Sequence, residues 1–263
     1  MCSSDLRQYT LPGRPGFAFP TSNPGEFILG LERHLRLFNT QTHEWRCVAG
    51  PVDSHTTGTI INDGTLFEGG LIFGCKDLRF AEKKAGLYLY RYSDRQLIEL
   101  RRDQICSNGK EVIQLQGQRT LIDIDSPTKT VVGYPLDVEA GRLGEPRILV
   151  DLRSGEAFPD GMIVTPDHRS VIISFYNPND VASGETRQYA LAEGTLERVW
   201  VSPGSPRVTC PRLVPTPNGV RLVVTTAVEH MTAEQVGRHA HAGCLMWGPT
   251  PFSQVGPSPV FQS

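Results

Sequence analysis

Short apolar runs alternate along the chain with polar turns that contain glycine, proline, asparagine or aspartate. The runs start 44, 50, 50 and 51 residues apart, at Phe27, Leu71, Leu121, Val171 and Leu222. A second run with an aromatic residue follows each of them, at Phe38, Tyr90, Tyr134, Tyr189 and Trp247. Because runs of this length between turn signals are typical of β-strands, and helical periodicity is nearly absent, the pattern predicts an all-β protein.

The spacing of the runs also predicts an architecture. A repeat of about 50 residues with four short strands has the length of one β-propeller blade. We interpret the runs that start at the first set of positions as the inner strands of successive blades, and residues 1–263 as a single propeller domain. A β-sandwich is the alternative, since it also consists of short strands joined by turns.

One stretch, Thr232 to His241, has helical spacing. Thr232 is a candidate N-cap, and Gln235 three residues later completes a capping box. We expect a short surface helix within the last blade. His239 and His241 are two residues apart, which places them on different faces of a helix, so we do not expect them to bind one metal ion.

Composition and charge narrow the class of partner. Of 263 residues 39% are hydrophobic, which suits a packed globular core, and the formal net charge is only −2. Charged residues of both signs are interleaved, so we expect no general attraction for nucleic acid or anionic membranes. No apolar run reaches the roughly 18 residues of a membrane span, and residues 1–12 lack the apolar core of a signal peptide. We therefore expect a cytoplasmic protein with a small-molecule or protein partner, in an oligomeric state that stays open.

The cysteines carry no pairing motif. None of the six belongs to a Cys-x-x-Cys pair, and they are scattered as Cys2, Cys47, Cys75, Cys106, Cys210 and Cys244. A chain of this length does not need a disulfide framework, so we expect reduced thiols.

Three oxygen-bearing side chains occupy equivalent positions in successive repeats. Asn62, Asn108 and Asp160 each open a unit, and each is followed by glycine directly or after one residue. In a propeller such positions form a ring around the channel, and carboxamide plus carboxylate oxygens suit a hard cation such as calcium. The alternative is that Asn-Gly and Asp-Gly are only turn residues. The next equivalent position is Cys210, and Arg212 beside it is a candidate substrate contact.

Several sequence motifs of this chain resemble those of the senescence marker protein (regucalcin), gluconolactonase and luciferin-regenerating enzyme family. The resemblance runs from about Gly16 to the C-terminus and is carried by Ile61-Asn62-Asp63-Gly64, Ser107-Asn108-Gly109, Asp125-Ser126, Phe158-Pro159-Asp160-Gly161-Met162, Val224-Thr225-Thr226-Ala227 and the closing segment from Met231 to Leu245. It implies a six-bladed propeller with a divalent metal in its channel.

The resemblance also implies chemistry. It makes Asn108 and Asp160 metal ligands, and Asn62 a ligand or a substrate contact beside the metal. Calcium is the expected metal and zinc is possible. Asp160 is then also the candidate general base in the hydrolysis of a sugar lactone or a similar cyclic ester.

Two departures from the family pattern leave a second interpretation open. The Glu-Gly-Pro motif that the family carries in its first blade is absent from this sequence. We therefore interpret residues 1–15 as the remnant of an incomplete first blade, with Arg7–Pro12 as its last strand. Glu26 and Glu32 are not expected to replace the missing ligand. Ile60 stands where sugar-lactone members commonly carry arginine. The alternative is therefore a weakened or inactive propeller with a binding or regulatory role, and we expect an open ring with an exposed edge strand.

Overall fold

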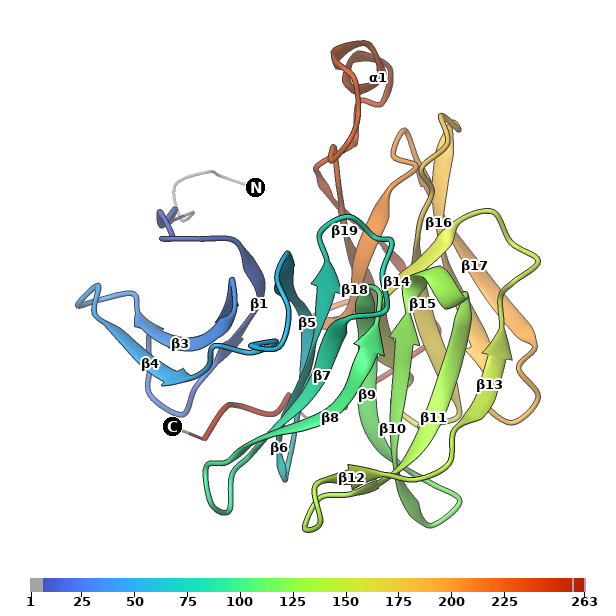
Figure 1. The fold of residues 1–263 in the computed structure, drawn as a ribbon. Helices are drawn as coiled ribbons and strands as arrows, with labels where there is room; N and C mark the ends of the chain where they lie inside the picture. Colours follow the sequence, from blue (N-terminus) through green and yellow to red (C-terminus); the bar gives the residue numbers. More distant parts are fainter. Residues whose placement is uncertain (1–6, 257, 263) are drawn as a thin grey trace.

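The computed structural model describes residues 7–256 and 258–262, which form five antiparallel sheets of consecutive strands (Figure 1). The first blade comprises β1 (Pro15–Pro20), β2 (Glu26–Leu31), β3 (His34–Asn39) and β4 (Trp45–Ala49). The second comprises β5 (Thr59–Phe67), β6 (Gly70–Asp77), β7 (Ala85–Arg91) and β8 (Leu97–Gln104). The third comprises β9 (Ser107–Leu115), β10 (Gln118–Asp125), β11 (Thr130–Asp137) and β13 (Arg147–Asp151), with the short β12 (Arg142–Leu143). The fourth comprises β14 (Phe158–Val164), β15 (Ser170–Tyr176), β16 (Ser183–Ala190) and β17 (Leu196–Pro203), and the fifth β18 (Val208–Thr216), β19 (Gly219–Thr226) and β20 (Leu245–Pro249).

The propeller fold is confirmed, but the number of blades is five and not six. The strand expected at Arg7–Pro12 is absent, because residues 7–14 have no strand pairing. Tyr9 and Leu11 instead pack on the free face of the first blade, where the ring centroids of Tyr9 and Phe38 are 5.5 Å apart. A lone segment without a hairpin partner covers apolar surface here without extending a sheet.

The apolar runs used to count the repeats are the second strands of the blades. The innermost strands are β1, β5, β9, β14 and β18, which contact one another from blade to blade in that order. The prediction that the runs at Phe27, Leu71, Leu121, Val171 and Leu222 are inner strands was therefore wrong. The second strand of a blade is covered on both faces by neighbouring blades, so it has the longest apolar run, whereas the innermost strand faces the channel and carries polar residues.

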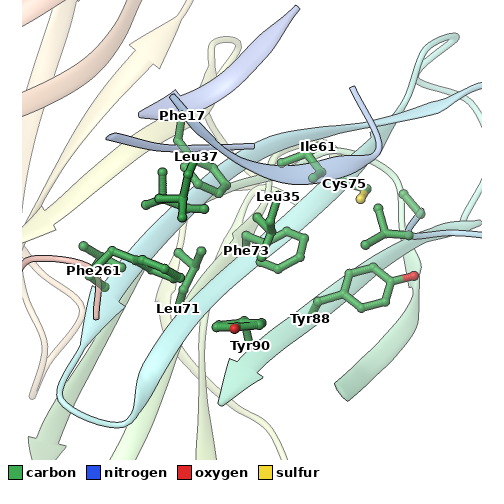
Figure 2. Packing of buried hydrophobic residues seen from close by; sticks show 14 residues of the cluster. Phe17, Leu35, Leu37, Ile61, Leu71, Phe73, Cys75, Tyr88, Tyr90 and Phe261 are labelled. Carbon is green, nitrogen blue, oxygen red and sulfur yellow. The ribbon is translucent and has the colours of Figure 1, made fainter. Parts of the chain in front are cut away.

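Apolar side chains fill the space between successive blades. Between the first two blades, Phe17 and Leu35 pack with Phe73 and Tyr88, as Figure 2 shows. Similar clusters lie between the second and third, the third and fourth, and the fourth and fifth blades. Burial of side chains of this size stabilises the fold by about 1.5–3 kcal/mol each, so most of the stability of the propeller lies between its blades.

The C-terminal segment joins the fifth blade to the first. After β20 the chain returns to the first blade, where the backbone N–H of Phe261 donates to the Pro20 carbonyl at 2.9 Å (Figure 1). The Phe261 ring is buried and stacks on Tyr90 of the second blade with a centroid distance of 5.6 Å (Figure 2). The tail thus connects the two ends of the five-bladed arc.

The fifth blade has an open edge and an uncovered face. β20 pairs only with β19 among the described strands, and Leu245 and Trp247 are 71% and 65% exposed. Met246, which points to the other face, packs against the fourth blade. The exposed edge strand expected from the sequence lies here.

The predicted helix is present as α1 (Ala233–Arg238), with the 3-10 turn η2 (Ser126–Thr128) elsewhere in the chain. Thr232 caps α1 and forms the predicted capping box with Gln235, but the helix ends at Arg238, earlier than expected. His239 is buried after the helix, with Nε2 2.6 Å from Asp180 Oδ1. Within the described residues, α1 and every other helical segment are too short to cross a bilayer.

Candidate functional site

A break in strand pairing occurs at the same level in all five innermost strands. The ladder between each innermost strand and its neighbour slips at Gly16, Asn62, Asn108-Gly109, Asp160-Gly161 and Thr209-Cys210. An irregularity of this kind is a β-bulge, which bends the strand and redirects its side chains. The bulges turn one residue of each blade toward the same end of the channel, and Gly16 provides no side chain there.

The glycines after Asn108 and Asp160 are required by close packing between blades. A Cβ atom on Gly109 would lie 2.4 Å from the Cβ of Met162, and one on Gly161 would lie 2.8 Å from the carbonyl oxygen of Thr209. Asp160 therefore sits at a bulge inside β14, and the alternative that Asp160-Gly161 is only a turn is wrong. Glycine is needed where one backbone approaches another this closely.

The redirected residues line a cavity of about 580 Å³ at the end of the channel. Asn62, Asn108 and Asp160 all belong to its wall. Its other polar and charged residues are Asp63, Lys76, Cys106, Ser126, Tyr176, Thr209, Cys210, Glu229 and His230. A pocket of this volume with several polar groups on a largely apolar wall suits a small molecule.

Hydrogen bonds connect Asn62, Asn108 and the backbone beside Asp160 across blades two, three and four. The Asn62 Nδ2 group donates to Asn108 Oδ1 at 3.1 Å. The Asn108 Nδ2 group donates to Ser126 Oγ at 2.7 Å, and this hydroxyl donates to the Pro159 carbonyl at 2.6 Å, next to Asp160. The network fixes the orientation of both amides and leaves Asn62 Oδ1 without a described donor.

Asp160 carries a half-buried carboxyl group that forms no ion pair with any described residue. Burial raises its pKa to about 8, the Asp63 carboxylate adds to the increase, and Lys76 opposes it. No ion pair of Asp160 is found within the described part of the chain. Since burial disfavours the charged form, a cation at this position would stabilise the carboxylate.

The oxygen atoms at the bulges fit a hard divalent cation. The donors are the Asn62 and Asn108 amide oxygens and the Asp160 carboxylate, and Asp63 adds a second carboxyl whose pKa burial also raises. Among residues 7–256 and 258–262, no three His, Cys, Asp or Glu side chains form a metal-binding group. A metal here would depend on amide oxygens and water, which calcium accepts.

The two thiols of the cavity are unsuited to nucleophilic chemistry. Burial raises the pKa of Cys106 well above its ordinary value; the Cys210 thiol is exposed, but the protein that surrounds it and the carboxyl groups of Asp63 and Asp160 also raise its pKa. Since the thiolate is the reactive form, both groups are neutral near pH 7. Cys47, Cys75 and Cys244 are also free thiols, whereas Cys2 lies outside the described residues.

Arg212 lies in a different cavity from Asp160. This second cavity, of about 390 Å³, is also lined by Glu111 and by Ser258 of the C-terminal segment. Arg212 is exposed, and its Nη2 group lies 3.4 Å from Ser258 Oγ. The structure therefore separates this predicted substrate contact from the other three predicted residues.

Ile60 and the two N-terminal carboxylates lie outside the first cavity. Ile60 is 6% exposed and belongs to the core. Glu32 accepts a hydrogen bond from the backbone N–H of Arg14 at 2.8 Å, and Glu26 accepts one from Thr21. The first described blade thus contributes no carboxylate to the cavity.

Sequence reasoning missed Asp63 and Lys76 as members of the cavity wall. Asp63 directly follows Asn62, and a strict alternation of faces along a strand would point it away from the channel. The bulge at Asn62 breaks that alternation. For Lys76, the available signal was a charged residue directly after the apolar run of β6.

Comparison with known proteins assigns the chain to a family. Residues 3–228 match the sequence pattern described as the SMP-30/Gluconolactonase/LRE-like region. The chain belongs to this family. A relative is the Bacillus subtilis (strain 168) protein "Putative sugar lactone lactonase YvrE", which is 23% identical over 242 residues, 87% of this chain and 77% of the relative.

Two solved structures with a similar fold are those of a regucalcin and of a luciferin-regenerating enzyme. A calcium-binding protein, regucalcin, from Agrobacterium tumefaciens str. C58 has a TM-score of 0.80 and 18% identity, covering 97% of this chain and 82% of its own. A luciferin-regenerating enzyme has a TM-score of 0.78 and 16% identity, with coverages of 95% and 83%. At these identities the likeness establishes the propeller fold.

Proposed function

We propose that the protein is a metal-dependent hydrolase that opens a sugar lactone or a similar cyclic ester. The observation that carries this proposal is that Asn62, Asn108 and Asp160 come from successive blades to the wall of one cavity. Membership of the SMP-30/gluconolactonase family and the similarity to a protein named as a lactonase support it.

The residues at the bulges would bind the metal ion and contact the substrate. Asn108 and Asp160 would hold the cation, and Asn62 would hold it or contact the substrate. Calcium is the expected ion, as in the name of the Agrobacterium protein, with zinc as the second choice. When bound, a divalent cation withdraws electron density from the ester carbonyl and stabilises negative charge that develops on its oxygen.

Asp160 would accept a proton from the attacking water molecule. A bound cation would favour the ionised form of Asp160, so this carboxylate would be a weak base that works mainly through its proximity to the water molecule. Water is the expected nucleophile because the Cys106 and Cys210 thiols stay protonated. The network through Asn62, Asn108 and Ser126 would keep the wall rigid while the ring opens.

A second candidate is a binding protein that has the fold and the cavity but does not catalyse hydrolysis. Two observations favour it: Gly16 provides no side chain at the first described bulge, and the fifth blade provides Thr209 and Cys210 instead of a carboxylate. Fewer carboxylates lower the affinity of an oxygen site for calcium.

Hydrolysis of glucono-1,5-lactone by the purified full chain tests the proposal. The protein is first treated with chelator, and proton release is then followed with and without added Ca²⁺ or Zn²⁺. We expect metal-stimulated turnover that Asp160→Asn lowers by at least about 100-fold, since loss of a general base typically costs that much. Asn108→Ala should mainly raise the metal concentration needed for half-maximal activity.

Asp123→Asn is the matched control, because Asp123 is also a buried carboxyl group but does not line the cavity. It should keep activity within a few-fold of the wild type. Metal-stimulated turnover that survives in Asp160→Asn would contradict the proposed mechanism. Calcium binding by calorimetry without any turnover would favour the second candidate.

A further inference from the structure

Lys76 brings an unpaired positive charge to the wall of the first cavity. It lies near the end of β6, and its ammonium group sits 5.3 Å from the centroid of the Phe80 ring, which also lines the cavity. In the part of the chain that the structure describes, the ammonium has no hydrogen bond and no ion pair. Contact with a ring face leaves its N–H donors free.

The other lysines that are partly or fully buried all have polar partners. Lys84 lies 3.2 Å from the buried Asp77 carboxylate, while Lys110 and Lys129 donate to backbone carbonyls. Half-buried ammonium groups are costly unless they are paired, so this chain generally provides partners for them. Lys76 is the exception, and its free donors face the cavity that we assign to the substrate.

The remaining charges of the cavity define what Lys76 can bind. Asp63, Asp160 and Glu229 belong to the same wall, yet none of them forms an ion pair with Lys76. Ile60 is buried in the core, so position 60 offers no positive group to the cavity. One lone ammonium among several carboxyl groups suits a single negative charge better than a phosphate dianion, which needs more cationic partners.

We infer that the substrate carries a free carboxylate and that Lys76 binds it. The substrate class is then a lactone of a sugar diacid, in which one carboxyl group forms the cyclic ester and the other remains ionised. This inference rests on the proposed hydrolase function and adds the substrate class. Lys76 acts as a specificity residue, because it touches the part of the substrate that does not react.

Two lactones that differ in one group provide the kinetic test. D-Glucaro-1,4-lactone carries a carboxylate where D-glucono-1,4-lactone carries a hydroxymethyl group. We expect the wild type to prefer the first by about 10-fold or more in kcat/KM, and this preference to weaken as salt screens the charge. Lys76→Met should remove the preference through a higher KM for the anionic lactone, and the ratio of the two kcat/KM values within each variant is the readout.

Lys83→Met is the matched control, because Lys83 is exposed on the neighbouring loop and lies outside the cavity. It removes the same charge from the molecule, so it tests whether only net charge matters. The control should keep the wild-type preference. An equal loss in Lys76→Met and Lys83→Met, or no preference in the wild type, would overturn the inference.

Binding of unreactive lactams separates this inference from the proposed catalysis. Pyroglutamate and 2-pyrrolidone are five-membered cyclic amides with and without a carboxylate. By calorimetry, we expect pyroglutamate to bind the wild type about 10-fold or more tightly than 2-pyrrolidone, and both to bind Lys76→Met equally. If this pattern holds without hydrolysis of either lactone, only the catalytic proposal fails. If glucono-1,4-lactone is hydrolysed but the carboxylate gives no advantage, only the Lys76 inference fails.

Discussion

At the scale of single residues, the wall of the first cavity combines side chains that recur from blade to blade with side chains that occur in one blade only. Asn62, Asn108 and Asp160 could be selected because they recur one blade apart, and equivalent positions of a propeller face the same channel. Lys76 and Asp63 belong to the same wall but do not recur in other repeats. Their place depends on a bulge and on side-chain packing, which a one-dimensional pattern does not specify.

The buried carboxyl group of Asp160 predicts how stability changes with pH in the metal-free protein. Its pKa in the folded state, about 8, lies above the ordinary 3.8, so between these values the folded state binds more protons than the unfolded state. Stability contributed by this group is therefore lost as pH rises through that window. In chelator, the free energy of unfolding of Asp160→Asn should exceed that of the wild type by a margin that grows by at least about 1 kcal/mol from pH 5 to pH 8.

Asp123→Asn serves as the control for this titration. Burial raises the pKa of Asp123 to about 6, so its margin over the wild type should stop growing above about that pH. Urea denaturation at each pH measures both margins. Added Ca²⁺ should stabilise the wild type and have little effect on Asp160→Asn. A margin for Asp160→Asn that does not change with pH would show that the folded protein holds this group as an ordinary carboxylate.

At the scale of elements, strands and the capped helix followed from local patterns. Apolar runs between turn residues gave the second strands, and Thr232 with Gln235 gave the start of α1. The innermost strands were harder to recognise, because Asn-Gly and Asp-Gly normally indicate turns. Here glycine follows Asn108 and Asp160 because the next blade packs closely against them.

The segment from Ala227 to Cys244, which contains α1, is held by a side chain of the fourth blade. Asp180 accepts hydrogen bonds from Arg238 and His239, while Glu229 and His230 of the same segment line the cavity. Asp180→Asn should weaken this tether and speed hydrogen exchange of the segment by about 3- to 10-fold, since each such bond contributes on the order of 1 kcal/mol. Global stability should change little.

Glu234→Gln is the control for the tether, because it removes only the exposed pair between Glu234 and Arg238 within α1. Surface pairs of this kind contribute little. Mass spectrometry of exchanged peptides distinguishes the two variants. Equal exchange in both, or a change spread over all blades, would argue against a local tether at Asp180.

At the scale of the whole molecule, the C-terminal tail connects the ends of a five-bladed arc. Phe261 is 1% exposed and packs against Tyr90 and Tyr92 of the second blade. Phe261→Ala should lower the free energy of unfolding by about 3–5 kcal/mol, the usual cost of removing a buried aromatic ring. Urea denaturation followed by tryptophan fluorescence measures the change.

The neighbouring Val260 provides the control for Phe261. Its side chain is 43% exposed, so Val260→Ala should change stability by less than about 0.5 kcal/mol. If both variants unfold at the wild-type urea concentration, the tail does not stabilise the arc in solution.

By itself the sequence determined the strand content, the repeat of about 50 residues and the three oxygen-bearing positions, because each of these is encoded in local residue order and its period. Tertiary structure decided the number of blades, which strand of each blade is innermost, and how the bulges bring Asn62, Asn108 and Asp160 to one cavity. It also decided that Phe261 returns to the first blade and that the Lys76 side chain lines the cavity with no ion-pair partner among the described residues. These features arise from contacts between residues far apart in the chain, and such contacts are set by packing and not by the local order of residues.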